Sequence, residues 1–450
     1  MIFYRRLYMI ALEKAKRPLK GDVFVPGDKS ISHRTIMFGA IANGTTEITG
    51  FLESADCLST IDCFRKMGII IDHSMRPSNG VPVITVHGKG LKGMDAPKQT
   101  LYTGNSGTTT RLMSGILVGQ DFDCNITGDS SIEKRPMSRI IKPLTQMGAD
   151  ISSVMGNDCC PLHISGGKKL RGINYRSPIA SAQVKSATLL AGLNAEGDTV
   201  VYEPALSRNH TEIMLAAFGA DIHNEVARDG SAAAILHPGM PLNGIKINVP
   251  GDISSAAYFI AAALVVPGSE LLIRNVGVNS TRDGIIRVLK QMGADITLLN
   301  LDESQEPKAD ILVRYSELSG GAGGSFEIGG KDIPTMIDEL PVVAVVAACA
   351  DFDTVIKDAA ELRVKESNRI DSVVENLQAM GCDIEATEDG MIIHGGNKLH
   401  GADIKTYNDH RLAMSFAIAA LAAEGTTRIV DDRCVGISYP SFFKDLQSLL

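Results

Sequence analysis

Residues 284–296 read GIIRVLKQMGADI, and this stretch predicts a helix, the end of that helix and the start of a strand. The apolar residues that share one helical face are Ile285, Ile286, Val288, Leu289 and Met292. Gly293 follows them and suits the left-handed position that commonly ends a helix. The segment before it, LLIRNV, is short and rich in branched residues, as strands are.

The same order of strand, loop, helix and glycine turn recurs along the chain. Five copies end in a turn glycine, and these are Gly68, Gly148, Gly219, Gly293 and Gly381. A sixth copy is the C-terminal stretch TTRIVDDRCVGISYPSFFKDLQSLL. The spacing of roughly 70–90 residues is too long for common solenoid repeats and suits a complete βα-type unit.

A run of small and apolar residues precedes each copy. The six runs are HRTIMFGAIANG, TTRLMSGILVGQ, SAQVKSATLLAGLNAEG, SSAAYFIAAALVVPG, LPVVAVVAACA and DHRLAMSFAIAALAAEG. A helix that is apolar on most of its circumference is buried, and Ala and Gly let its neighbours approach closely. We therefore expect an α/β (α+β) fold in which buried helices lie inside and sheets lie outside.

Six units predict two similar domains of three units each. The tripeptide Pro-Gly-Asp occurs at residues 26–28 and 250–252, each time just before a small-residue helix. We take both as crossover points. The expected domains are residues 28–251, and residues 1–27 joined to 252–450, with an active site in the cleft between them.

Composition excludes several classes of protein. The 450 residues are 44% hydrophobic and carry a net charge of −8, which argues against a general nucleic-acid surface. The longest apolar run, near 341–350, is too short to span a membrane. The eight cysteines form no CxxC pair, and the ten histidines form no metal-binding motif. Arg5 and Arg6 interrupt the apolar run at the N-terminus, so we do not expect a signal peptide. We expect a cytoplasmic protein with reduced thiols.

Cations cluster where the small-residue helices begin. PGDKSISHR supplies Lys29, Ser30 and Arg34, and TGNSGTTTRL supplies Asn105, Gly107 and Arg111. The free N–H groups of a helix N-terminus favour anions. The alternative to an anion-binding site is that these residues cap the helices and that their charges are solvated. The second motif lacks the Lys of a nucleotide-binding P-loop.

Further charged or polar groups occupy matching loops and helices. IEKRPMSRI holds Arg135, ASAQVKSA holds Ser181, Gln183 and Lys185, and SRNHTE holds Arg208. Polar groups on a helix made for burial need partners, which either a ligand or core hydrogen bonds could supply.

The second half combines acids with cations. MIDELP holds Asp338 beside Glu339, ELRVKESNRI holds Lys365, Glu366 and Arg369, and NDHRLAMSF holds Arg411. Lys365 and Arg369 stand four apart, so we expect them to share one helix face. A salt-bridged surface helix is the alternative. Cations at matching corners suggest a site for small polyanions, and the acids among them could transfer protons.

These motifs, in this order along the chain, resemble the 5-enolpyruvylshikimate-3-phosphate (EPSP) synthase family from end to end. The resemblance implies two domains of three βαβαββ-like units, an inside-out α/β barrel, and an open cleft that closes on substrate. It implies transfer of the enolpyruvyl group of phosphoenolpyruvate to the 5-hydroxyl of shikimate 3-phosphate, by addition and elimination, with release of phosphate. That reaction belongs to the shikimate pathway of aromatic amino-acid biosynthesis and uses no metal or organic cofactor.

The resemblance also implies residue roles. The shikimate 3-phosphate site would comprise Lys29, Ser30, Arg34, Ser181, Gln183, Arg208, Asp338 and Lys365. The phosphoenolpyruvate site would comprise Lys29, Asn105, Gly107, Arg135, Gln183, Arg369 and Arg411. The catalytic residues would be Asp338, Glu366, Lys29 and Lys365. Asp338 would take the hydroxyl proton, although Lys29 remains an alternative base, and Glu366 would protonate the methylene carbon.

Several expectations about partners follow. We expect a monomer that binds no nucleic acid or membrane, and inhibition by glyphosate that Gly107→Ala would weaken by filling space. UDP-N-acetylglucosamine enolpyruvyl transferase is a rival, but its reactive Cys is absent from residues 132–137. A noncatalytic anion-binding protein of the same fold is another, and an RNA-end-processing enzyme would need a more basic surface.

Overall fold

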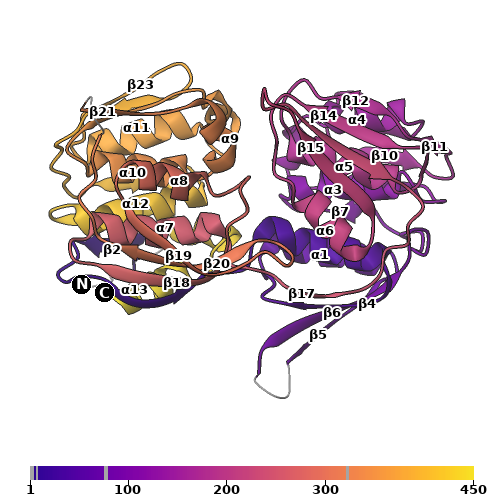
Figure 1. Ribbon diagram of the computed structural model, residues 1–450, viewed down its shortest axis with the longest axis horizontal. Coiled ribbons are helices and arrows are strands. Elements are labelled where there is room, and N and C mark those ends of the chain that lie inside the picture. Colours follow the sequence, from indigo (N-terminus) through magenta and orange to yellow (C-terminus); the bar gives the residue numbers. More distant parts are fainter. Residues whose placement is uncertain (1–4, 7–8, 76–79, 321–323) are drawn as a thin grey trace. The chain divides into compact units, whose positions relative to one another are not determined.

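The chain forms two compact units, Gly27–Pro250 and Met1–Pro26 with Gly251–Leu450. The computed structural model describes residues 5–6, 9–75, 80–320 and 324–450. Each unit contains three four-stranded sheets (Figure 1). Within the residues that are described, every helix falls short of the length and apolarity that a bilayer crossing requires.

One module repeats in all six four-stranded sheets. In Gly27–Pro250 it is clearest as β12 (Asn174–Arg176), α5 (Ala182–Gly192), β14 (Thr199–Glu203), α6 (His210–Phe218), β15 (Asp221–Val226) and β16 (Ala232–His237). The sheet order is β12-β14-β16-β15. The strands on either side of the first helix, β12 and β14, pair in parallel, and the other pairs are antiparallel. This is the predicted βαβαββ unit.

The other two sheets of Gly27–Pro250 have the same order. One is β17-β4-β6-β5, with β17 (Lys246–Asn248), β4 (Asn43–Thr49), β6 (Pro82–Lys89) and β5 (Ile70–Met75). The other is β7-β8-β10-β9, with β7 (Leu101–Tyr102), β8 (Cys124–Thr127), β10 (Leu162–Ser165) and β9 (Asp150–Ser153). A short parallel pair joins β11 (Leu170–Arg171) to β13 (Ala195–Glu196).

The three sheets of the other unit repeat this order again. They are β3-β18-β20-β19, β21-β22-β24-β23 and β25-β26-β2-β1. Their strands are β3 (Lys20–Phe24), β18 (Glu270–Gly277), β20 (Lys308–Arg314), β19 (Asp295–Asp302), β21 (Ser325–Ile328), β22 (Asp353–Ile356), β24 (Met391–Ile393), β23 (Ile384–Ala386), β25 (Asp403–Lys405), β26 (Thr426–Val430), β2 (Met9–Glu13) and β1 (Arg5–Arg6). The N-terminal strands therefore complete sheets of the C-terminal half.

The small-residue runs form the innermost helices of each unit. They are α1 (Lys29–Ile41), α3 (Gly107–Leu117) and α5 in one unit, and α7 (Ile253–Val265), α10 (Leu340–Ala348) and α12 (His410–Ala422) in the other. Every residue of α7 is buried. A Cβ on Gly115 of α3 would lie 2.2 Å from the carbonyl oxygen of Ala187 in α5, so glycine permits this close helix contact.

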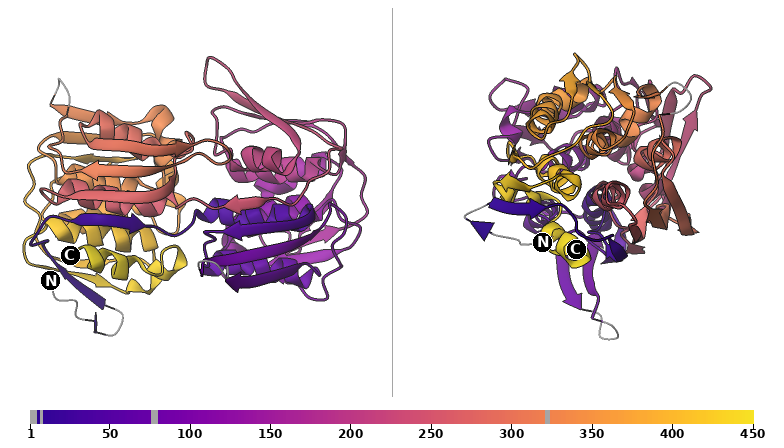
Figure 2. Two further views of the ribbon diagram at one scale, coloured as in Figure 1. Left: turned by 60° about the horizontal axis from the view of Figure 1, so that its bottom comes forward. Right: turned by 90° about the vertical axis from the view of Figure 1, so that its left-hand side faces the viewer.

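The amphipathic runs form the second helix of each module. They are α2 (Ala55–Lys66), α4 (Ser138–Gln146), α6, α8 (Gly284–Gln291), α11 (Arg369–Ala379) and α13 (Phe442–Leu449). The five predicted turn glycines all have positive φ, from 78° at Gly68 to 104° at Gly219. The right-hand view of Figure 2 looks along several helices of one unit, with sheets around them. The predicted α/β fold with helices inside is confirmed.

Short elements complete the chain. They are the 3-10 turns η1 (Ile132–Lys134), η3 (Gly330–Asp332), η4 (Ala360–Val364) and η5 (Asp432–Ile437), and the helical turn α9 (Ile333–Met336). All eight cysteines are free thiols, and six of them are buried.

Candidate active site

The first site element of Gly27–Pro250 is the N-terminus of α1. The side chain of Asp28 caps the helix by accepting a hydrogen bond from the backbone N–H of Ile31 at 2.8 Å. Lys29 and Ser30 are the first two residues of the helix, as predicted. The Nζ of Lys29 forms an ion pair with Asp56 of α2, a partner that sequence reasoning missed. Lys29 is therefore held at the helix N-terminus by a carboxylate that an anionic ligand could displace.

Arg34 lies one turn further along α1 and is only 3% exposed. Its Nε donates to Thr211 Oγ1 at 2.8 Å, and its Nη2 donates to Ser186 Oγ at 3.0 Å. Its Nη1 donates to the carbonyl oxygen of Ser30 at 2.9 Å. These bonds come from three different helices, so the guanidinium has a fixed position beside Ser30.

The start of α5 is held by a buried ion cluster. Lys185 Nζ lies 2.8 Å from Glu203 and 2.9 Å from Glu212, and its side chain is 1% exposed. Glu203 also accepts a hydrogen bond from the backbone N–H of Ser181 at 2.9 Å. It accepts another from Ser207 Oγ at 2.8 Å. The cluster therefore fixes both Ser181 and the segment that leads to Arg208.

Gln183 connects α5 to the start of α3. Its Oε1 accepts a hydrogen bond from Arg111 Nη1 at 2.5 Å, and its Nε2 donates to Thr108 Oγ1 at 3.2 Å. Arg111 belongs to the second sequence motif but had no assigned role. Its Nε is buried without a hydrogen-bond partner among the residues described. A buried donor without an acceptor is a position that an anionic ligand could complete.

Arg135 and Asn105 lie together near the start of α3. Arg135 Nη2 donates to Asn105 Oδ1 at 2.7 Å, and Asn105 Nδ2 donates to Asp129 at 2.9 Å. A Cβ on Gly107 would lie 2.9 Å from Arg111 Nη1 and 3.4 Å from Arg135 Nη1. The absence of a side chain at Gly107 thus leaves room for these two guanidinium groups.

Arginines gather here without matching acids. Burial, and then the charges of Arg135 and Arg139, lower the pKa of Arg111 to about 10. Within the described part of the chain, no ion pair joins Arg111, Arg135 or Arg139 to a carboxylate. Cations that repel one another at a helix N-terminus are suited to bind an anion.

The second cluster lies in the other unit and centres on Arg369, the first residue of α11. Its guanidinium contacts three carboxylates: Asp409 at 2.8 Å, Glu366 at 2.6 Å and Asp338 at 3.4 Å. Arg369 and Asp409 are 1% and 0% exposed, whereas the Glu366 side chain is 38% exposed. One buried cation therefore holds both predicted proton-transfer acids.

Arg411, in the first turn of α12, approaches the same acid from another side. Its Nη1 donates to the carbonyl oxygen of Asp338 at 3.2 Å, and its Nη2 lies 3.6 Å from Asp338 Oδ2. Asp409, the N-cap of α12, accepts a hydrogen bond from the backbone N–H of Arg411 at 2.9 Å. The structure thus brings together Asp338, Glu366, Arg369 and Arg411.

The electrostatics of this cluster favour charged forms. Burial, the largest effect, raises the pKa of Asp409, but the charge of Arg369 and the hydrogen bonds from Arg369 and the Arg411 backbone together lower the net pKa. Desolvation, the largest effect, also raises the pKa of Glu366, but the charges of Arg369 and His410 and a backbone hydrogen bond together lower the net pKa. Burial, the largest effect, lowers the pKa of Arg411, but the neighbouring groups, Asp338 foremost with Glu339 and Asp252, together raise it above its usual range.

The expectation that Lys365 and Arg369 share a helix face is wrong. Lys365 follows the turn η4 with extended backbone, and α11 begins only at Arg369, after the N-cap Asn368. The Asn368 side chain accepts a hydrogen bond from the backbone N–H of Asp371. This cap places the start of the helix after Lys365. Lys365 Nζ still lies 3.8 Å from Asp338.

Arg282 is a buried cation that sequence reasoning missed. Its Nη2 donates to Ser254 Oγ at 2.8 Å and lies 3.3 Å from Asp252 and 3.8 Å from Glu339. It precedes α8 as Arg208 precedes α6, so the internal repeat was the signal that could have found it.

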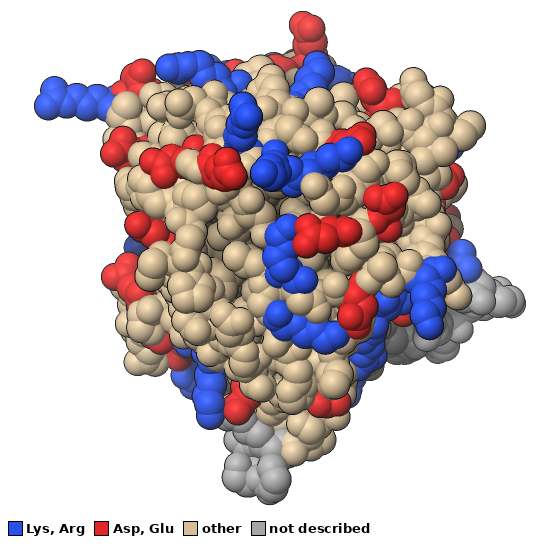
Figure 3. Space-filling view, turned by 90° about the vertical axis from the view of Figure 1, so that its right-hand side faces the viewer, with Lys and Arg blue, Asp and Glu red and all other residues tan. Residues whose placement is uncertain are grey.

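One face of the surface carries charges of both signs. On the face in Figure 3, Lys and Arg side chains are interspersed with Asp and Glu.

Comparisons with known proteins agree with one another. The family model described as EPSP synthase (3-phosphoshikimate 1-carboxyvinyltransferase) matches residues 13–446. A 3-phosphoshikimate 1-carboxyvinyltransferase of Bacillus cereus is 52% identical over 97% of this chain and 98% of its own. The protein of the same name from Brevibacillus brevis is 54% identical over 96% and 98%. A structure of EPSP synthase from Acinetobacter baumannii matches with a TM-score of 0.87 and 45% identity, covering 98% of both chains.

Proposed function

The chain belongs to the EPSP synthase family, and from this we propose that it transfers the enolpyruvyl group of phosphoenolpyruvate to the 5-hydroxyl of shikimate 3-phosphate. Phosphate is released. The observation that carries the proposal is the pair of acids on one guanidinium: Asp338 and Glu366 lie 3.4 Å and 2.6 Å from Arg369. A base and an acid positioned on one anion-binding cation fit an addition across a phosphorylated enol.

The two substrates repel each other, so binding them together is much of the task. We assign shikimate 3-phosphate to Lys29, Ser30, Arg34, Ser181, Gln183, Arg208, Asp338 and Lys365. We assign phosphoenolpyruvate to Lys29, Asn105, Gly107, Arg135, Gln183, Arg369 and Arg411. Orientation of this kind contributes about 7–11 kcal/mol in favourable cases. Arg111 joins the second set, because its buried Nε has no hydrogen-bond partner among the residues described.

The reaction proceeds by addition and then elimination. In the addition step Asp338 takes the proton of the 5-hydroxyl, whose oxygen bonds to carbon 2 of phosphoenolpyruvate, and Glu366 gives a proton to carbon 3. In the elimination step the bond from carbon 2 to the phosphate oxygen breaks. Glu366 takes a proton back from carbon 3, and the proton held by Asp338 leaves with phosphate. Neither step needs a metal or organic cofactor.

The lowered pKa of Glu366 gives substrate binding a second role. A carboxylate cannot donate a proton, and the charge of Arg369 is the main effect that favours this form of Glu366 against desolvation. An anion bound to Arg369 would oppose that charge and raise the pKa of Glu366 towards the range of a general acid. Binding of phosphoenolpyruvate would thereby prepare its own proton donor.

Lys29 must change partner to reach a substrate. Its ammonium group is paired with Asp56 in α2. A substrate phosphate would displace that carboxylate, because charge-assisted bonds to phosphate are strong. We assign the base to Asp338 and keep Lys29 as the alternative base.

A steady-state assay of phosphate release from phosphoenolpyruvate tests the proposal. Release should require shikimate 3-phosphate and should not occur with UDP-N-acetylglucosamine in its place. Binding of both substrates without release would instead indicate a noncatalytic anion-binding protein. We further propose that the protein works as a cytoplasmic monomer and that glyphosate inhibits it.

A further inference from the structure

Three potential metal ligands share one face of the sheet β12-β14-β16-β15 in Gly27–Pro250. Asp221 and His223 are two residues apart on β15, so their side chains point to the same face. His237 on β16 pairs directly opposite Asp221 in the antiparallel register. Asp221 and His223 are exposed, while the intervening Ile222 is buried in the core. Strand geometry alone therefore places the three side chains together on the solvent side.

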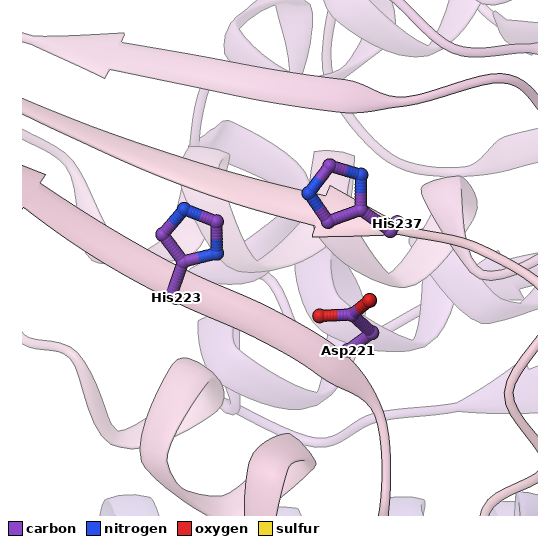
Figure 4. Close-up of side chains that lie close together, drawn as sticks. All are labelled: Asp221, His223 and His237. Carbon is purple, nitrogen blue, oxygen red and sulfur yellow. The ribbon is translucent and has the colours of Figure 1, made fainter.

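The distances within this group suit a metal ion. One ligand atom from each residue lies within 4.8 Å of the others. Figure 4 shows the two imidazoles beside each other, with the Asp221 carboxylate below His237. The ring centroids are 5.9 Å apart and the rings are inclined by 27°. Zinc is bound by imidazole and carboxylate at about 2.0–2.2 Å. Small rotations of exposed side chains would bring all three onto one ion.

A second acid orients His237. Asp198, just before β14, accepts a hydrogen bond from His237 Nδ1 at 2.9 Å. A carboxylate on one ring nitrogen fixes the tautomer and leaves the other nitrogen as a metal ligand.

We propose that Asp221, His223 and His237 bind one divalent transition-metal ion of the zinc class, with Asp198 positioning His237. Two imidazoles and one carboxylate suit zinc, copper and nickel better than magnesium, which prefers oxygen ligands. The remaining coordination positions face solvent and hold water. Because β15 is the edge strand of its sheet, the ion would also fasten that edge to β16.

Isothermal titration of the full chain with zinc chloride, after treatment with a chelator, tests the site. The wild type should bind one ion. His223→Gln and His237→Gln should each lower the affinity by more than tenfold, and Asp198→Asn by about 10–100-fold because an outer-sphere partner is lost. Magnesium chloride should give no comparable binding. Thermal unfolding of the wild type should shift to higher temperature with zinc.

The matched control is His87→Gln. His87 is another exposed histidine on an antiparallel pair, β5 and β6, where its Nε2 lies 3.0 Å from Asp72. Among the described residues this histidine–carboxylate pair belongs to no group of three potential metal ligands, so the change should leave zinc affinity unaltered. Equal affinities for wild type and His223→Gln, or the absence of one-to-one binding in the wild type, would overturn the proposal.

Discussion

Lys185→Met removes the cation of the buried cluster that supports the start of α5. Lys185 is 1% exposed and compensates two carboxylates that are each 2% exposed. Glu203 would keep hydrogen bonds from Ser181 and Ser207. Glu212 would keep none among the residues described, because its carboxylate contacts only the Lys185 ammonium. The variant therefore leaves a charge buried without compensation.

The expected loss of unfolding free energy is about 3–5 kcal/mol, the usual cost of removing one partner of a buried ion pair. For a unit of this size each kcal/mol lowers the unfolding midpoint by about 2–4 °C, so the shift should be roughly 6–20 °C. Calorimetry measures it. Because Lys185 fixes the position of Glu203, which in turn holds Ser181, the KM for shikimate 3-phosphate should rise in the same variant.

Two further variants make the test specific. Lys142→Met removes an exposed lysine of α4 and should change stability by less than about 0.5 kcal/mol. Lys185→Met combined with Glu212→Gln removes the uncompensated charge and should recover part of the loss. If Lys185→Met were as stable as Lys142→Met, the reasoning about this cluster would be refuted.

The remaining predictions concern the reaction and the acid range. Asp338→Ala and Glu366→Gln should each lower turnover by about 10²–10⁴-fold in a phosphate-release assay while substrates still bind. Burial raises the pKa of Asp409, but the charge of Arg369 and the hydrogen bonds to this carboxylate together lower the net pKa, so Asp409 stabilises the fold above its unfolded pKa. That contribution is lost as the pH falls below about 4, and unfolding midpoints of Asp409→Asn against pH should lack this acid loss. Gly107→Ala should raise the glyphosate inhibition constant more than the KM for phosphoenolpyruvate.

Each of these has a clear contrary result. Near-normal turnover in both acid variants would remove Asp338 and Glu366 from proton transfer, and Glu385→Gln, an exposed acid on β23, is the matched control. An acid-range profile of Asp409→Asn that parallels the wild type would mean that Arg369 does not stabilise the ionised acid. Identical inhibition constants for wild type and Gly107→Ala would contradict the prediction that a methyl group at position 107 fills space that glyphosate needs.

Local sequence patterns predicted the helices and their glycine turns well, because helix burial and turn conformation depend on residues that are close in sequence. Gly68 and Gly293 adopt the left-handed conformation that their place after an amphipathic run indicated. The six small-residue runs are the buried helices, since only burial suits a helix that is apolar all round. The two Pro-Gly-Asp tripeptides indicated that residues 1–27 belong with the second half of the chain, and β3 pairs with β18.

Side-chain partners could not be predicted in the same way. Lys29 pairs with Asp56 on the next helix, and Arg282 joins Ser254 to Glu339 across 85 residues of sequence. Such contacts depend on how helices pack, which no local pattern encodes. The prediction that Lys365 and Arg369 share a helix face was wrong for a related reason. Asn368 is the N-cap, so the helix begins only at Arg369, and a four-residue spacing implies a shared face only when both residues lie in one helix.

The most direct test of the proposed chemistry is the reaction of phosphoenolpyruvate and shikimate 3-phosphate in D₂O, followed by mass spectrometry of the product. Addition places a solvent-derived proton on the methylene carbon, and elimination removes one of three hydrogens from it. We predict deuterium in the methylene group of a share of the product, and much slower incorporation with Glu366→Gln. Product that forms at a normal rate without any deuterium would contradict addition and elimination through these two acids.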